Sequence, residues 1–450
     1  MATTESRGDR RSVLDRVLGA SADVRAGEGA TALLLALNVF LILMAYYVLK
    51  PVREALILGE GSAELKSYMS AVQVVLLLAI VPAYGRLVAR LPRMGLINAV
   101  NAVFIGCLVA FFAAAEAGVP IAIPFFLWIG IFNLMVVAQF WAFANDVYSR
   151  EEGERLFAIV GFGASLGAVV GARAAGRLIE PLGVNLLLLV GAVILAAQVL
   201  LSNWVDRRER GRRSARPPRP AAATKARTNG FAMVFQSRYL LLIGLMLMLL
   251  NLVNTTGEYI LGGFVSEAAA AMVANGTAGG SSQGQLIGEF YSKYFLLVNI
   301  LGLVLQLFVV SRIVKRWGVP VAVMILPVIA CAGYSMLAFY PILRGVLAAK
   351  VLENSTDYSL NNTVRNMLFL PCTYEQKFSA KQAIDSFFVR IGDVLSAALV
   401  FVGSTMLALR PQAFAAINAL LVAAWLVIAW RVGRDYRALT APAAAVAEVA

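Results

Sequence analysis

The stretch "DRRERGRRSARPPRPAAATKARTNG", residues 206–230, is a basic segment near the middle of a chain of 450 residues. It holds nine lysines and arginines, and three prolines within it, Pro217, Pro218 and Pro220, disfavour a helix. Cytoplasmic loops of membrane proteins carry an excess of Lys and Arg. The stretch is therefore predicted to be a flexible cytoplasmic connector. Between apolar segments, a topology signal is a commoner reason for such a run than nucleic-acid binding.

Apolar segments long enough to span a membrane lie on both sides of this connector. A spanning helix needs about 20 mostly apolar residues. Six segments precede the connector and six follow it, at residues 30–58, 66–90, 94–115, 119–145, 156–179, 183–205, 238–264, 286–310, 319–341, 343–369, 380–409 and 411–432. The sequence thus predicts an all-α membrane protein with twelve transmembrane helices in two six-helix bundles.

The composition agrees with a chain that lipid covers. Hydrophobic residues make up 60% and charged residues 14% of the sequence, against roughly 45–50% and about 25% in soluble domains. The mean hydropathy is +0.77. The absence of histidine excludes histidine metal sites, Ser-His-Asp triads and histidine proton relays. The three cysteines lie in apolar stretches and indicate no disulfide framework.

The predicted organisation has five parts. They are a cytoplasmic N-terminal segment at 1–29, a first bundle at 30–205, a basic linker at 206–237, a second bundle at 238–432 and a cytoplasmic tail at 433–450. The charged first part is not typical of a cleaved signal peptide. It is expected to contain an amphipathic surface helix, whose apolar face would be formed by Val13, Leu14, Val17 and Leu18.

Two basic loops support this topology and indicate that the two halves of the chain are repeats of each other. "YGRLVARLPRMG" (84–95) and "VSRIVKRWGVP" (310–320) share the pattern Arg-apolar-Val-x-Arg six helices apart, as in a parallel repeat. If helices alternate, both loops lie on the connector's side, and the loop at 266–285 on the opposite side has no Lys or Arg. Both termini are then cytoplasmic. The loops resemble the basic loop of the major facilitator superfamily, without its usual acidic residue.

The first predicted helix carries charges inside its apolar sequence, in "AYYVLKPVREALIL" (45–58). Lys50, Arg53 and Glu54 follow helical spacing and share one face. A charge at a helix centre costs about 2.5–3.5 kcal/mol on insertion scales. These residues either face a cavity or, in the case of Lys50, snorkel to the membrane boundary. We favour the cavity because Glu54 cannot snorkel far and apolar sequence continues to Leu58.

Predicted helices 8, 10 and 11 carry further polar stripes. Helix 10 presents Lys350, Asn354, Asp357, Asn361 and Arg365 about one turn apart, with Glu353 beside Lys350. This face either lines a pathway or forms a buried ion-pair network between helices, and we favour the pathway. Further charges at helical spacing are Lys381 with Asp385, Arg390 with Asp393, and Lys293 in helix 8. A cation-rich pathway suits an anionic substrate.

Two other patterns lie after predicted helix 4, one in the loop and one in predicted helix 5. The loop "NDVYSREEGERLF" (145–157) has charged residues that are expected to form solvated or inter-helix ion pairs and to gate the cytoplasmic side: Asp146, Arg150, Glu151, Glu152 and Arg155. Lys381, near the cytoplasmic end of predicted helix 11, is a further candidate gating residue. Helix 5 then has glycines at 163, 167 and 171. Their spacing predicts close helix packing and not a dinucleotide-binding loop.

Three blocks of sequence resemble the ATP/ADP translocase family of plastids and obligate intracellular bacteria, over about residues 30–435. "YYVLKPVREALIL" (46–58) is similar to the family's Leu-Arg-Pro-Leu-Lys-Asp stretch, and "FWAFANDVYSREEGERLFAIVGFGASLG" (140–167) to its Phe-Trp-x-Phe-Ala-Asn block. "DYSLNNTVRNMLFLPCTYEQKFSAKQAIDSFFVRIGDVLSAAL" (357–399) is similar to its Lys-Tyr-Ser-Leu, Tyr-Ile-Pro-Leu and Gly-Lys-Ala-Ala-Ile-Asp run. The resemblance implies a major-facilitator-like fold and nucleotide exchange.

The resemblance also suggests roles for individual residues. The family's helix 1 lysine and acid fall on Arg53 and Glu54, and its helix 11 lysine and aspartate on Lys381 and Asp385. The chain departs from the family at Asp357, where the family has lysine, and lacks its helix 4 acid. Near the family's helix 7 acid it has Asn254, with Glu258 one turn on. The candidate substrate-binding residues are Lys50, Arg53, Glu54, Asn254, Glu258, Lys293, Lys350, Asp357, Asp385 and Arg390.

The first functional hypothesis is a nucleotide antiporter of the ATP/ADP type that works by alternating access. The alternatives are a proton-coupled carrier of another organic anion or solute, with Asp385, Asp357 or Glu54 as the proton-binding group, and a non-transporting membrane sensor or scaffold. We expect no enzyme activity, cofactor or metal. The expected partners are a nucleotide and the lipid bilayer, with no nucleic acid, for a monomer in a bacterial inner membrane.

Overall fold

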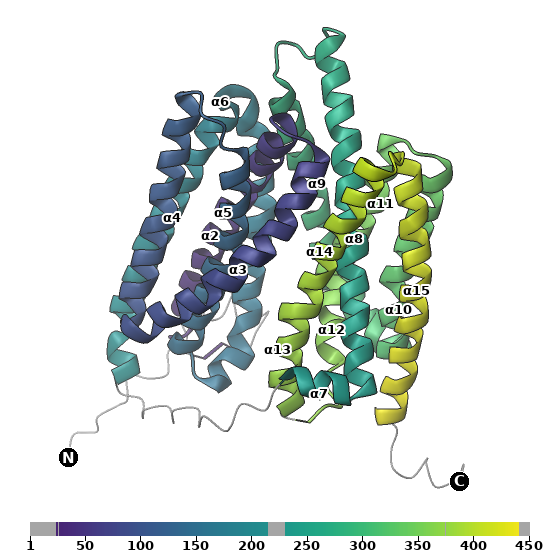
Figure 1. Ribbon diagram of the computed structural model, residues 1–450. Helices are drawn as coiled ribbons and strands as arrows, with labels where there is room; N and C mark the ends of the chain where they lie inside the picture. The colour runs from purple at the N-terminus through teal and green to yellow at the C-terminus, as the bar shows by residue number, and fades with distance from the viewer. Residues whose placement is uncertain (1–23, 26, 215–229, 374, 441–450) are drawn as a thin grey trace, which may run out of the picture. The chain divides into compact units, whose positions relative to one another are not determined.

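The computed structural model describes residues 24–25, 27–214, 230–373 and 375–440, and within these ranges the chain forms helices joined by turns and contains no β-strand (Figure 1). The predicted surface helix near the N-terminus lies outside the described residues. So do residues 215–229 of the predicted linker and residues 441–450 of the predicted tail.

Contacts divide the chain into two compact units. The first comprises Met1–Leu56, Leu77–Arg219 and Gly284–Leu296, and the second comprises Ile57–Leu76, Pro220–Gln283 and Leu297–Ala450. The grouping departs from chain order in two short segments, because Ile57–Leu76 packs with the second unit and Gly284–Leu296 packs with the first.

Four long helices make up most of the first unit. They are α2 (Gly29–Gly59), α4 (Arg93–Glu116), α5 (Ala122–Val147) and α6 (Arg150–Ser214). The second unit contains α7 (Gly230–Gln236), α8 (Arg238–Ala274), α10 (Val310–Phe339), α11 (Leu343–Thr356), α12 (Asn362–Met367), α13 (Lys381–Ala383), α14 (Val389–Val400) and α15 (Pro411–Thr440). Helices α3 (Ala63–Arg90) and α9 (Gln283–Val304) contribute to both.

By length and composition, nine helical runs among the described residues can cross a membrane. Two of them, Arg155–Arg210 and Gln283–Phe339, have 56 and 57 residues, which at 1.5 Å per residue is more than twice the thickness of a bilayer core. Each contains a glycine with a φ of 73°, Gly183 in one and Gly318 in the other. The left-handed backbone there turns the chain, so each run comprises two spans.

The predicted tenth span is built differently from the others. It consists of α11, the π-helical segment η2 (Asp357–Asn361) and α12. Four more π-helical segments interrupt helices in the second half of the chain: η1 (Leu305–Val309), η3 (Gln376–Ala380), η4 (Ile384–Phe388) and η5 (Phe401–Met406). Among the described residues, the nine runs, two of them divided, and this segment together correspond to the twelve predicted helices.

Helices α2 and α6 pack closely through glycine. A Cβ atom on Gly163 would overlap the carbonyl oxygen of Ala36, and Gly167 meets the backbone of Phe40 in the same way. Because only glycine allows the two backbones so near each other, the prediction of helix packing at this repeat is confirmed.

Helix α6 also runs on to Ser214, inside the range predicted as linker. Local pairing accounts for this helical extension. Arg210 Nε lies 2.9 Å from Asp206 Oδ2 one turn away, and Glu209 accepts a hydrogen bond of 2.8 Å from Thr31 of α2. The prolines that disfavour a helix begin only at Pro217. At the other end of the chain, α15 continues to Thr440, inside the range predicted as tail.

Candidate functional site

Lys50 of α2 lies inside the first unit, where aromatic rings surround its ammonium group. The residue is 8% exposed. Its Nζ lies 4.0 Å from the ring centre of Phe295 in α9, 5.2 Å from that of Tyr47 and 5.7 Å from that of Tyr46. A ring face attracts a cation by about 0.5–2 kcal/mol. The rings therefore replace part of the hydration that the cation loses within the helix.

Arg53 is paired with its neighbour Glu54. Its Nε donates to Glu54 Oε1 at 3.0 Å, and an Nη of the same guanidinium forms an ion pair with this oxygen. The ring centre of Phe126 lies 5.1 Å from the guanidinium carbon. The side chain of Arg53 is 17% exposed and that of Glu54 is 1% exposed, so an anion would reach Arg53 first. We call these residues the α2 cation site: Tyr46, Tyr47, Lys50, Arg53, Glu54, Phe126 and Phe295.

Lys350 of α11 lies inside the second unit with no exposed surface. Its Nζ donates to Asn254 Oδ1 at 2.6 Å, and it forms ion pairs with Glu353 at 3.2 Å and with Glu258 at 3.6 Å. Of the two roles that the sequence left open for this face, these contacts favour the ion-pair network over direct lining of a pathway.

The polar contacts around Lys350 and its two glutamates extend over four helices. Tyr334 of α10 donates to Glu353 at 2.9 Å, Asn354 donates to Glu258 at 3.0 Å, and Lys66 of α3 forms an ion pair with Glu258 at 3.6 Å. We call the following residues the lysine network: Lys66, Asn254, Glu258, Tyr334, Lys350, Glu353 and Asn354. Its two lysines and two glutamates balance in charge, as buried ionic groups within a membrane must.

Arg390 and its partner lie at the contact of α8 and α14. Asp393 accepts hydrogen bonds from Asn251 at 2.6 Å, from Thr255 at 2.9 Å and from Arg390 at 3.2 Å. The side chain of Arg390 is 35% exposed, and that of Asp393 is 14% exposed. The aspartate is thus held by three donors, while the arginine keeps surface that an anion can reach.

The remaining candidate substrate residues are Asp385, Asp357 and Lys293. The contacts given for them among the described residues do not join them to one another. Lys381 and Asp385 form an ion pair of 2.7 Å along one helical face. Asp357 accepts a hydrogen bond of 2.7 Å from Asn361 within η2, and Lys293 lies exposed on α9.

The turn between α5 and α6 holds the candidate gating residues. Arg155 donates to both carboxylate oxygens of Glu28, at 2.8 and 2.9 Å. Asp146 forms an ion pair with Arg93 at the start of α4. Glu152 accepts from the backbone N–H of Ser149 at 2.7 Å at the start of α6. The side chain of Arg150 lies outside the described part of the chain.

The pKa of Glu28 reflects this environment. Burial alone would raise the pKa, but the hydrogen bonds from Arg155 and from the backbone N–H of Arg25, with the charges of both arginines, lower it overall. Glu28 therefore stays ionised to a lower pH than an ordinary glutamate and holds the start of α2 against α6.

Several residues that complete these groups were not among the sequence-based candidates. Phe295 lies in an apolar run, where nothing distinguishes it from other membrane aromatics. Lys66 and Glu28 stand at the ends of predicted helices, where charge is ordinary. Tyr334 is a single tyrosine in an apolar helix. Only their partners in space, on other helices, give them a role.

Two families match this chain. The Major Facilitator Superfamily matches residues 34–366, and the family described as TLC ATP/ADP transporter matches residues 332–436. The second match confirms the predicted resemblance to ATP/ADP translocases. It covers the stretch that contains Lys350, Asp357, Lys381, Asp385 and Arg390.

The chain is also similar to carrier proteins of Chlamydia species. ADP,ATP carrier protein 1 of Chlamydia pneumoniae is 23% identical over 369 residues, which are 69% of this chain and 66% of that protein. ADP,ATP carrier protein 1 of Chlamydia trachomatis serovar D is 21% identical over 354 residues, 69% of this chain and 64% of that protein. The match thus spans slightly less than two thirds of each relative.

Solved structures share the fold at low sequence identity. The nucleoside transporter NupG has a TM-score of 0.62 at 13% identity, with 91% of this chain and 100% of that chain covered. A bacterial homologue of the iron transporter ferroportin has a TM-score of 0.63 at 14% identity, with 90% and 98% covered. All these proteins are carriers or transporters, in agreement with the prediction that the chain is no enzyme. The all-helical, major-facilitator-like membrane fold is confirmed, and the chain belongs to the Major Facilitator Superfamily.

Proposed function

We propose that the protein exchanges nucleotides of the ATP/ADP type across a membrane by alternating access. The observation that carries this proposal is the similarity to proteins named ADP,ATP carriers over 69% of the chain. The match of residues 332–436 to the TLC ATP/ADP transporter family also supports the proposal.

The chemistry of the α2 cation site supports an anionic substrate. A guanidinium binds phosphate oxygens through two parallel hydrogen bonds, and such charge-assisted bonds are about twice as strong as neutral ones. A phosphate that reaches Arg53 would take the place that Glu54 holds in this structure. Lys50, beside it, would add a second positive charge.

In the C-terminal part of the chain, Arg390 has the exposed surface to bind a phosphate, and Lys381 with Asp385 has surface for the same purpose. We propose that Asn254, Glu258 and Lys350 contribute through the lysine network, which holds α8 and α11 in register. Lys293 and Asp357 are proposed to add charge along the pathway.

Exchange would follow from the cost of an empty site. A bound phosphate would add to the compensation for the hydration that Arg53 and Lys50 lose inside the bundle, so reorientation across the membrane would be more favourable with substrate than without it. We further propose that Asp146, Arg150, Glu152, Arg155 and Lys381 gate the cytoplasmic side. Both termini would then be cytoplasmic, by the positive-inside rule. The transporting unit would be one copy of the chain in a bacterial inner membrane.

The test is uptake of radiolabelled ATP into proteoliposomes loaded with ADP, with unloaded vesicles as the control. Uptake that requires internal ADP supports the proposal. Uptake driven by a proton gradient without internal nucleotide would contradict it in favour of a proton-coupled carrier. Folded protein that takes up no nucleotide under either condition would also contradict it.

A further inference from the structure

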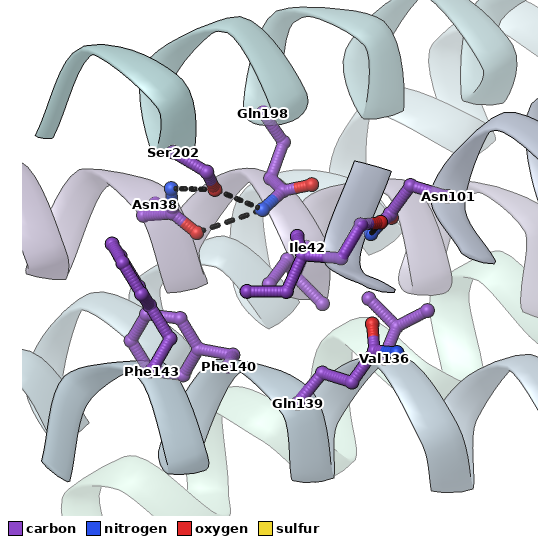
Figure 2. A pocket seen from close by; sticks show the side chains of 10 residues that line it. Asn38, Ile42, Asn101, Val136, Gln139, Phe140, Phe143, Gln198 and Ser202 are labelled. Carbon is purple, nitrogen blue, oxygen red and sulfur yellow. Dashed lines mark hydrogen bonds between the residues drawn. The ribbon is translucent and has the colours of Figure 1, made fainter. Parts of the chain in front are cut away.

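A small polar cavity lies inside the first unit, among α2, α4, α5 and α6 (Figure 2). Its polar lining consists of amides and one hydroxyl, and each of these residues is at most 5% exposed. They are Asn38, Asn101, Gln139, Gln198 and Ser202. Apolar side chains complete the wall, and no charged residue of the described chain lines the cavity.

Part of this cluster is satisfied by direct hydrogen bonds. Asn38 Nδ2 donates to Ser202 Oγ at 2.7 Å, and Gln198 Nε2 donates to Asn38 Oδ1 at 2.9 Å and to Ser202 Oγ at 2.8 Å. These bonds join α2 to α6. Asn101 Nδ2 donates to the carbonyl oxygen of Ile97 one turn back on α4, at 2.8 Å.

The other amide atoms have no hydrogen-bond partner among the described residues. They are Nε2 and Oε1 of Gln139, Oδ1 of Asn101 and Oε1 of Gln198. Figure 2 shows the three amide groups around the same space beside Ile42. An unpaired polar group buried away from water is costly, and a membrane offers no water around the bundle to compensate.

We propose that this cavity is a binding site for one water molecule. The four atoms present one donor and three acceptors, and a water that accepts from Gln139 Nε2 can donate two hydrogen bonds to the oxygens. Buried waters in proteins typically make about three hydrogen bonds to such groups. Through these hydrogen bonds, the water would connect α4 and α5 to α6, which is itself joined to α2.

The size and charge of the cavity argue for water over other occupants. Its space is just large enough for about one water molecule. A nucleobase or an inorganic anion would need more room, and an anion or a metal ion would also need a charged residue in the lining.

The sign of a stability change tests this assignment. Gln139→Met replaces the amide by an apolar chain of similar length. If water is bound, the variant removes its donor and lowers the melting temperature of the detergent-purified protein by roughly 2–4 °C. If the cavity is dry, the variant removes an unsatisfied buried amide and raises the melting temperature. Gln236→Met on the exposed face of α7 is the matched control, with no shift expected.

A second test asks whether Gln139 and Asn101 act through a shared partner. Neither hydrogen-bonds to the other, so shifts of Gln139→Met and Asn101→Leu would add if no water joined them. If a water joins them, the melting temperature of the double variant should fall by less than the sum of the two single shifts. An experimental structure should also show one compact density peak within about 3.2 Å of both amides. Additive shifts, elongated density or no density would overturn the proposal.

Discussion

The α2 cation site and the lysine network stabilise lysines and arginines within a membrane protein in two different ways. In the first unit, three aromatic rings lie around the ammonium group of Lys50, and Arg53 is paired with Glu54. In the second unit, Lys350 has polar partners from two helices and no exposed surface.

The difference separates a group that can bind a ligand from one that holds helices together. A substrate oxygen can reach Arg53 through the exposed part of its side chain. Lys350 has no exposed surface, and removing one of its bonds leaves other buried ions uncompensated. We therefore expect substitutions in the two regions to have different effects: loss of transport at the first and loss of stability at the second.

The largest effect is expected for Lys350→Met, which leaves the buried network with an excess negative charge. Breaking a buried ion pair from one side costs about 3–5 kcal/mol. Thermal unfolding in detergent should show a large loss of stability. The double variant Lys350→Met/Glu353→Gln restores charge balance and should recover much of it. A single variant as stable as wild type would show that the network does not hold the helices.

Arg53→Gln should reduce ATP/ADP exchange by about 10- to 100-fold, since charge-assisted hydrogen bonds contribute about 1.5–3 kcal/mol each. Its melting temperature should also fall, because the buried carboxylate of Glu54 loses its cation, but by less than in Lys350→Met, since a glutamine amide can still donate to Glu54. The control is Arg177→Gln, an exposed arginine of α6. Exchange that is equal in Arg53→Gln and the control would remove Arg53 from the substrate site.

A smaller effect is expected for Phe295→Leu, which removes the ring nearest to Lys50. Because the substitution also loses packing, its cost is compared in wild type and in the Lys50→Met background. The coupling between the two changes should be about 0.5–2 kcal/mol in thermal unfolding. Coupling near zero would mean that the rings pack around Lys50 without stabilising its charge.

The smallest effect is expected for the Glu28–Arg155 pair, at about 0.2–1 kcal/mol. Because the folded pKa of Glu28 lies below its ordinary value of 4.5, the pair stabilises the protein above that pH, and its contribution is lost as the pH falls through the folded pKa. Glu28→Gln should therefore be less stable than wild type at pH 7, and the gap should close as the pH falls below 4.5 and through the folded pKa of Glu28. A gap that stays constant with pH would contradict the pairing.

The sequence predicted the helices well because their signal is local. The apolar length of a segment depends only on residues that neighbour each other in the sequence. The Gly163 repeat predicted close packing because glycines four residues apart lie on one face of a helix and let another backbone approach. The end of α6 was harder to predict, since the pairs of Asp206 and Glu209 extend the helix into a stretch whose charge suggested a linker.

The sites were predicted in part. Lys50, Arg53 and Glu54 stand out because charge is rare inside an apolar helix, and helical spacing puts them on one face. Phe295 and Tyr334 could not be found in this way, because apolar and aromatic residues are ordinary in membrane helices. Spacing on one helix also could not decide whether Lys350 lines a pathway or joins a network, because its partner Glu258 comes from another helix.

The most direct test of the central claim is protection of the purified protein by ATP against thermal unfolding. We expect ATP to raise the melting temperature of wild type and of the charge-balanced variant Lys350→Met/Glu353→Gln, because the α2 cation site is intact in both. We expect little or no protection of Arg53→Gln. Equal protection of Arg53→Gln and wild type would contradict the claim that the α2 cation site binds the phosphates of the substrate.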